Sequence, residues 1–448
     1  MLSVSEAEAR AAFLVAAARK AGADAADALY IGDASTEVQV RLGALEDVTR
    51  SEGEEIGLRA FVGTRSASVS SSDLSAEALV ALVERVVAMA REAPEDPYAG
   101  LAPEALLYRG GAPDLEADDG ADPSPVALKE RAQAIEDCAR AMPGITNSEG
   151  ASVSAGRSVI ALATSLDFAR GYTTSGYAGA ASVIAGTGGN MQRDYASHNV
   201  RHYADMDPPE AIGRLAGERA AKRLNPGRLP SGAMPVVFDP RVGGSLIGHL
   251  VGAMAGPGIA RRTSFLLGRE DEAIFGEDIV VVDDPHRPRG LRSKPFDGEG
   301  VTTAARRLID GGRLTGWLLN SASARQLGLE TTGHATRGIG GAPGAGATNV
   351  HMEPGTLSPA ELIAGIKAGL YVTETIGHGL NPVTGDYSKG ASGFIIRDGE
   401  IAEPIAEITI AGNIVGMFRA LIPANDLEHR RSVNVPTLRI DGMVIAGA

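Results

Sequence analysis

The stretch Phe394-Ile-Ile-Arg-Asp-Gly-Glu-Ile-Ala402 sets an Asp-Gly pair between two apolar runs. Asp-Gly favours the tight turn of a β-hairpin, because both residues accept the backbone angles that such a turn requires. The same pair stands between apolar runs at Asp310-Gly311 and at Asp441-Gly442. We therefore expect three hairpins in a strand-dominated C-terminal domain, which is interrupted by helices over 240–254 and 358–370.

The sequence before residue 226 alternates between helical and strand patterns. Ser5 and Glu8 suit a capping box for a first helix that ends near Gly22, and Ser124-Pro125 is typical of a helix start. Further helices are expected over 75–94 and 208–224. Strands are expected where apolar and polar or small residues alternate, at 29–42, 54–70 and within 152–200.

These patterns predict an α+β fold, in which a helix-and-sheet N-terminal region precedes a strand-dominated C-terminal domain. Residues 95–125 are rich in Pro and acidic residues and are interpreted as a linker. We place an N-terminal α+β domain at 1–95, a central α+β segment with antiparallel hairpins at 96–225, and a C-terminal β-rich domain at 226–448.

Charge and cysteine content narrow the classes of function. The chain has 42 Lys and Arg against 56 Asp and Glu, a net charge of −14, so it has no general attraction for nucleic-acid phosphate. Its single cysteine, Cys138, excludes an internal disulfide and suits a reducing compartment. No apolar run is long enough to span a membrane. We expect a cytoplasmic protein that binds neither nucleic acid nor membrane.

Local motifs taken alone do not make an active site. The glycine-rich stretch 338–346 has Pro343 where a G-x-G-x-x-G pattern needs glycine, which favours a surface loop over a phosphate site. His198 and His202 lie four residues apart in a polar stretch, where solvated histidines are favoured over metal ligands. His249 stands alone in an apolar segment, as a hydrogen-bonded core histidine would.

Several longer segments resemble the TldD/TldE (PmbA) metallopeptidase family, and in particular its TldE/PmbA branch, whose members are often labelled modulators of DNA gyrase. The matching segments are Gly248-His-Leu-Val-Gly-Ala-Met-Ala-Gly256, Pro295-Phe-Asp-Gly-Glu-Gly-Val301, Gly316-Trp-Leu-Leu-Asn-Ser-Ala-Ser-Ala-Arg325, Gly385-Asp-Tyr-Ser-Lys-Gly-Ala-Ser-Gly-Phe394 and Glu407-Ile-Thr-Ile-Ala-Gly-Asn413. Weaker likeness extends into the N-terminal region, so the resemblance spans nearly the whole chain.

The resemblance implies a zinc peptidase built from two related subunits, of which the TldD subunit carries an H-E-x-x-x-H motif and a cysteine ligand. Laid on this chain, that motif puts Gly244 at the first histidine, Ser245 at the glutamate and His249 at the second histidine. The stretch 425–436 has no cysteine. We therefore expect no metal ligand set and no catalytic residue in this chain, with His249 as a vestigial candidate and Zn²⁺ on the TldD-type partner.

The resemblance thus favours a metal-free subunit that forms a cavity and positions an extended peptide, unfolded or modified, at zinc held by the partner. The alternative is a stand-alone peptide-binding or scaffolding homodimer without peptidase activity. The chain alone is expected to be inactive. Residues proposed to face substrate or partner are Gly385, Asp386, Tyr387, Ser388, Lys389, Gly390, His334 and Arg337. For the glycine-rich segment 385–393, a structural hairpin turn is an equally good interpretation.

Overall fold

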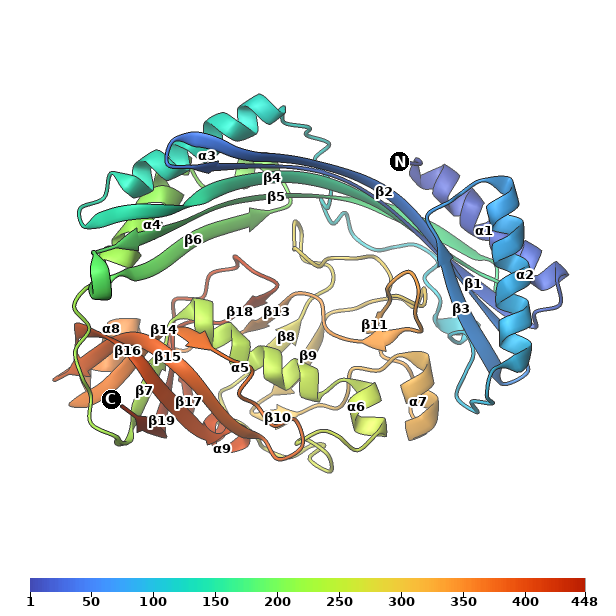
Figure 1. Cartoon of the computed structure of the whole chain (residues 1–448). Coiled ribbons are helices and arrows are strands. Elements are labelled where there is room, and N and C mark those ends of the chain that lie inside the picture. The colour runs from blue at the N-terminus through green and yellow to red at the C-terminus, as the bar shows by residue number, and fades with distance from the viewer. Residues whose placement is uncertain (448) are drawn as a thin grey trace.

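The computed structural model describes residues 1–447 and has two main parts, a large arched sheet and a C-terminal domain beneath it (Figure 1). The arched sheet is antiparallel, with strand order β3-β2-β1-β4-β5-β6. Its strands are β1 (Ala25–Arg41), β2 (Ala44–Val62), β3 (Arg65–Ser71), β4 (Ile145–Thr164), β5 (Phe168–Ala185) and β6 (Gln192–Val200). This single sheet runs through both of the first two expected segments.

Four helices cover the outer face of the arch, and the strand alternation explains why. Alternate residues of a strand point to opposite faces, so Ala26, Ala28 and Tyr30 pack against helices, while Leu29 faces the C-terminal domain. Helices α1 and α2 cover one end of this face, and α3 and α4 cover the other. The helices are α1 (Val4–Lys20), α2 (Ala76–Glu92), α3 (Pro125–Arg140) and α4 (Pro209–Lys222).

The C-terminal domain is built on a six-stranded sheet with strand order β16-β15-β14-β7-β19-β17. Strand β16 also pairs with β19, so five of these strands close into a barrel-like ring. The strands are β7 (Gly232–Phe238), β14 (Ala368–Ile376), β15 (Asp386–Arg397), β16 (Glu400–Asn413), β17 (Leu421–Pro423) and β19 (Leu438–Ala446).

Smaller elements complete the C-terminal domain. A five-stranded sheet has the order β10-β9-β8-β13-β18, and β11 pairs with β12. Its strands are β8 (Val281–Asp283), β9 (Arg306–Asp310), β10 (Arg313–Leu314), β13 (Val350–Met352) and β18 (Val433–Asn434), beside β11 (Ala335–Thr336) and β12 (Gly344–Ala345). The helices are α5 (Pro240–Ala253), α6 (Gly256–Ala260), α7 (Ser321–Leu327), α8 (Pro359–Ala364) and α9 (Ile414–Arg419).

The largest apolar core lies in the C-terminal domain, where α5 packs against the barrel-like sheet. Phe238 of β7 and Leu246 of α5 are fully buried in it. Phe275 and Phe418 stack with ring centroids 4.5 Å apart. This core fixes α5, which carries the segment that resembles the zinc motif. None of the helices within residues 1–447 has the length and apolar character needed to cross a membrane.

Two of the three expected hairpins are confirmed, and the third is wrong. Asp310-Gly311 joins β9 to β10, and Asp398-Gly399 joins β15 to β16. Asp441-Gly442 instead lies inside β19, where the pairing register with β7 shifts between Ile440 and Met443. Gly442 has φ +79°, so the pair forms a bulge in a strand that continues, because its neighbours bind it on both sides of the shift.

The other differences are local. The first helix begins after Ser3, whose capping box uses Glu6, rather than at Ser5. The expected strand 54–70 is two strands joined by a turn at Gly63-Thr64, and only 359–364 of the expected helix 358–370 is helical. The expected linker is irregular, and Arg325 ties it to the C-terminal domain through three carbonyl groups, those of Tyr98, Gly100 and Leu101.

Candidate functional site

Helix α5 presents the residues that occupy the zinc-motif positions. Asp239 caps its first turn by accepting a hydrogen bond from the backbone of Arg241, and Pro240 at the first position suits a helix start. Leu246 and Leu250 are fully buried against the sheet. Figure 1 shows α5 along the C-terminal domain beneath the arched sheet.

The structure brings His249 together with Tyr387 and Lys389 of β15. The imidazole and phenol ring centroids are 6.2 Å apart and nearly perpendicular, and the Lys389 Nζ lies 5.7 Å from the centre of the Tyr387 ring. Tyr387 and Lys389 share a face of β15 because they are two residues apart. Ser245 lies one turn before His249 on the same side of α5. We call Ser245, His249, Tyr387 and Lys389 the α5–β15 cluster.

Three polar atoms of the α5–β15 cluster are buried without a hydrogen-bond partner in the described chain: Ser245 Oγ, His249 Nε2 and Tyr387 Oη. Burial, with a smaller contribution from the nearby Lys389 ammonium, lowers the pKa of His249 to about 4. Burial also lowers the pKa of Lys389 and raises that of Tyr387. The cluster therefore holds a neutral imidazole beside a cation.

This arrangement does not fit a catalytic zinc ion. Such an ion needs about three protein ligands, whereas α5 offers the imidazole of His249 beside Gly244 and Ser245. The Lys389 ammonium would also repel a cation at this place. Within residues 1–447, no group of three or more His, Cys, Asp or Glu residues is placed to hold a metal ion.

Residues 386–393 of the glycine-rich segment 385–393 lie within strand β15, so most of the segment is strand rather than a hairpin turn. Gly385 has φ +78° and turns the chain into β15, which pairs with β14 and β16. Asp386 and Ser388 are exposed, whereas Tyr387 is 2% and Lys389 9% exposed. Gly390 follows on the same strand. An open hollow of about 590 Å³ is lined by Asp386, Tyr387 and Ser388 of β15 and by residues 379–383. The exposed face of the segment is thus accessible.

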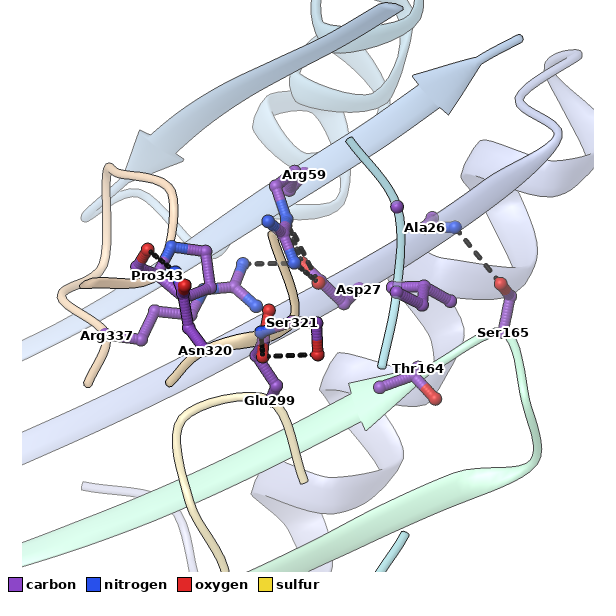
Figure 2. Close-up of polar contacts among 12 residues, drawn as sticks. Ala26, Asp27, Arg59, Thr164, Ser165, Glu299, Asn320, Ser321, Arg337 and Pro343 are labelled. Carbon is purple, nitrogen blue, oxygen red and sulfur yellow. Dashed lines mark hydrogen bonds and ion pairs between the residues drawn. The ribbon is translucent and has the colours of Figure 1, made fainter. Parts of the chain in front are cut away.

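His334 and Arg337 lie elsewhere, in a buried polar region of the C-terminal domain from which Arg337 reaches the arched sheet. His334 Nε2 is 3.2 Å from an Asp283 carboxylate oxygen, and its Nδ1 is 2.9 Å from the Thr332 hydroxyl. Arg337 Nη2 is 2.6 Å from Asp27 Oδ1 of β1, as Figure 2 shows. These two residues are therefore not part of the α5–β15 cluster.

Asp27 and Arg59 belong to this buried region and were not identified from the sequence. Arg59 Nε is 3.1 Å from Asp27 Oδ2, and the side chains of Arg59 and Asp27 are 7% and 1% exposed. Both residues lie in strands that the alternation of apolar and polar residues predicts. A charged residue in a strand is usually on the surface, so burial of these two is not expected. No local signal marks this pair as buried.

Asp297 and Glu299 lie close by, in the segment 295–301 that resembles the family. Asp297 Oδ1 accepts hydrogen bonds from the backbone of Glu299 and Val301. Glu299 accepts bonds of 2.8 and 2.7 Å from the backbone and hydroxyl of Ser321 (Figure 2). Burial raises the pKa of both carboxyl groups. In the sequence, the signal that points to Asp297 and Glu299 is the family resemblance of the segment 295–301.

Comparison with known proteins covers nearly all of the described chain. Family models for the PmbA/TldA metallopeptidase domain 1, central domain and C-terminal domain match residues 26–90, 118–224 and 231–447. The metalloprotease PmbA of Escherichia coli O157:H7 is 37% identical over 412 residues, which cover 92% of this chain and 89% of that protein. A metalloprotease PmbA homologue of Haemophilus influenzae is 34% identical over 100% of this chain and 98% of its own length.

Solved structures show the same fold. A protein of Bacteroides thetaiotaomicron described as a modulator of DNA gyrase superposes with a TM-score of 0.92 at 26% identity, and all of both chains is covered. TldE of Thermococcus kodakarensis superposes with a TM-score of 0.87 at 21% identity, covering 99% of this chain and 100% of that chain. From the matched family models and the two PmbA relatives, the chain belongs to the PmbA/TldD metallopeptidase family.

Proposed function

We propose that this chain is the subunit of a heteromeric PmbA/TldD-type zinc metallopeptidase that binds no metal itself. In this proposal the chain helps to enclose a cavity and positions an unfolded or modified peptide at zinc held by a TldD-type partner. The observation that carries it is the α5–β15 cluster, in which one imidazole faces the ammonium of Lys389 where a zinc subunit would need further ligands.

Two surface features support a role in holding an extended chain. In the described structure, residues 44–55 of β2 pair with β1 on one side and with no strand on the other. Such an edge can take up a further strand. The exposed residues Asp386 and Ser388 border the hollow beside β15. We propose these surfaces for the peptide or the partner subunit, and the cytoplasm as the compartment, because the single Cys138 suits reducing conditions.

Co-expression with a TldD-type protein tests the proposal. We expect the two chains to co-purify, peptide cleavage to require both, and zinc to be stoichiometric in the pair but not in this chain alone. Stoichiometric zinc in the isolated chain would overturn the metal-free assignment. Failure to co-purify or to promote cleavage would instead favour a stand-alone peptide-binding homodimer.

A matched pair of variants tests the β15 surface. Ser388→Arg places a large cation on the exposed face of β15, next to the hollow, and is expected to weaken complex formation or cleavage. Glu400→Arg is the control, because Glu400 is exposed at the opposite end of the β15–β16 hairpin. Equal effects of the two variants on co-purification and on cleavage would contradict a specific role for this surface.

A further inference from the structure

A separate cavity of about 250 Å³ lies between the inner face of the arched sheet and the loops of the C-terminal domain. Its apolar wall consists of strand residues from β1, β4 and β5 together with one aromatic ring of the C-terminal domain: Leu29, Ile31, Ile160, Leu162, Tyr172 and Phe296. Its polar wall includes Lys294, Asp297 and Arg337, and the exposed Thr336 marks its rim. The cavity thus joins an apolar wall to two basic side chains.

The Arg337 guanidinium is buried and incompletely paired. Its side chain is 1% exposed, and its Nε and Nη1 have no hydrogen-bond partner in the described chain. Its one anionic contact among residues 1–447, Asp27, also receives the guanidinium of Arg59, so one carboxylate serves two guanidinium groups (Figure 2). A buried donor without an acceptor is costly, and a ligand that supplies an acceptor removes this cost.

Lys294 is the second basic side chain of the cavity, and it is also weakly bonded. Burial lowers the pKa of its amine, whereas Asp297 and Asp283 act to raise it. Its Nζ donates to the Ala335 carbonyl at a long distance of 3.3 Å. Asp297, the carboxylate in the same wall, already accepts three backbone hydrogen bonds, two of them at Oδ1 and one at Oδ2 from Ala335. The cavity therefore has donor capacity that the surrounding chain does not use.

We propose that this cavity binds the carboxylate end of a peptide whose last residue is apolar. The carboxylate lies at Arg337 and Lys294, and the apolar side chain packs against Ile31, Ile160 and Phe296. A volume of about 250 Å³ holds roughly one residue, so the remainder of the peptide leaves past Thr336. This proposal rests on the proposed function in one respect, namely that the ligand is a peptide. The cavity itself is lined by residues of this chain.

The ligand class is tested by calorimetry on the full chain without partner or zinc, with N-acetyl-leucine, N-acetyl-leucinamide and the peptide Ala-Ala-Leu as probes. We expect the two acids to bind and the amide to bind at least about tenfold more weakly, a loss typical of a charge-assisted hydrogen bond. Equal binding of acid and amide, or no binding of either, overturns the site. Binding of N-acetyl-leucine without Ala-Ala-Leu overturns the peptide as ligand.

Variants of Lys294 locate the site. Lys294→Met is expected to weaken Ala-Ala-Leu at least about tenfold, and Lys294→Arg to restore most of the affinity, because it keeps the positive charge. Lys367→Met is the matched control, since Lys367 is exposed in the loop before β14. Unchanged affinity in a folded Lys294→Met, checked by circular dichroism and thermal unfolding, refutes the proposal. These binding measurements need no partner subunit. Their outcome is therefore independent of whether the chain co-purifies with a TldD-type protein.

Discussion

Asp27→Asn tests how strongly the two parts of the molecule depend on one buried carboxylate. Asp27 of β1 is 1% exposed and contacts Arg59 of the arched sheet and Arg337 of the C-terminal domain, whose side chains are 7% and 1% exposed. Among residues 1–447, the variant leaves two buried guanidinium groups without an ion-pair partner within 4 Å. Breaking a buried ion pair from one side costs about 3–5 kcal/mol, or roughly a 150- to 5,000-fold shift in the unfolding equilibrium.

The effect should depend on pH in a defined direction. Burial acts to raise the pKa of Asp27, but Arg337 and Arg59 outweigh it and hold this pKa below the ordinary value of 3.8. A carboxyl group with a lowered pKa stabilises the fold above its unfolded pKa and loses that contribution as pH falls through the folded pKa. The difference between wild type and variant is therefore complete at pH 7 and shrinks below about pH 3.8.

Urea unfolding measures this difference with two probes. Trp317, the chain's one tryptophan, is 4% exposed in the C-terminal domain and reports on that domain by fluorescence, while circular dichroism reports on both parts. Glu37→Gln is the control, because Glu37 is an exposed carboxylate on the same strand and should change stability by less than about 0.5 kcal/mol. A loss below about 1 kcal/mol in Asp27→Asn, or one that persists undiminished at pH 3, would refute the reasoning.

Two further substitutions test the site and the packing between the two parts. Lys389→Met should raise the pKa of His249 above its value of about 4 but keep it below 6.5, because burial is the larger cause; an NMR titration of the imidazole that shows no rise contradicts the contact. Gly57→Ala places a methyl group 1.9 Å from the Ile339 carbonyl oxygen, whereas Gly53→Ala on the same strand meets no atom within 4 Å. Urea unfolding should show a loss of about 1–3 kcal/mol in the first and little in the second; similar losses would argue against this close approach.

Local signals in the sequence predicted most of the secondary structure. Ser124-Pro125 does start α3, and Asp398-Gly399 does join β15 to β16. The same Asp-Gly signal was wrong at Asp441-Gly442. A dipeptide indicates which backbone angles are favoured locally, but it does not indicate which strands pair with the residues on either side. Strand β19 pairs with β7 on both sides of the pair, and this long-range pairing decides the outcome.

The site was predictable only in part. The family resemblance pointed to His249 and to the segment containing Tyr387 and Lys389, but not to their contact, which depends on α5 packing across β15. The pairing of Asp27 with Arg337 joins residues far apart in the chain, and no spacing rule relates them. Whether these residues bind peptide or partner stays a prediction.

Closure of the C-terminal domain by β19 has a consequence for synthesis. Strand β7 is translated more than 200 residues before β19, its neighbour in the ring, and β16 also waits for β19 to close the circle. A nascent chain that ends before Leu438 therefore keeps two open strand edges, which are prone to pair with other chains. The C-terminal domain can complete its fold only once residues 438–446 have left the ribosome, so truncation in β19 should yield aggregated rather than shortened native protein.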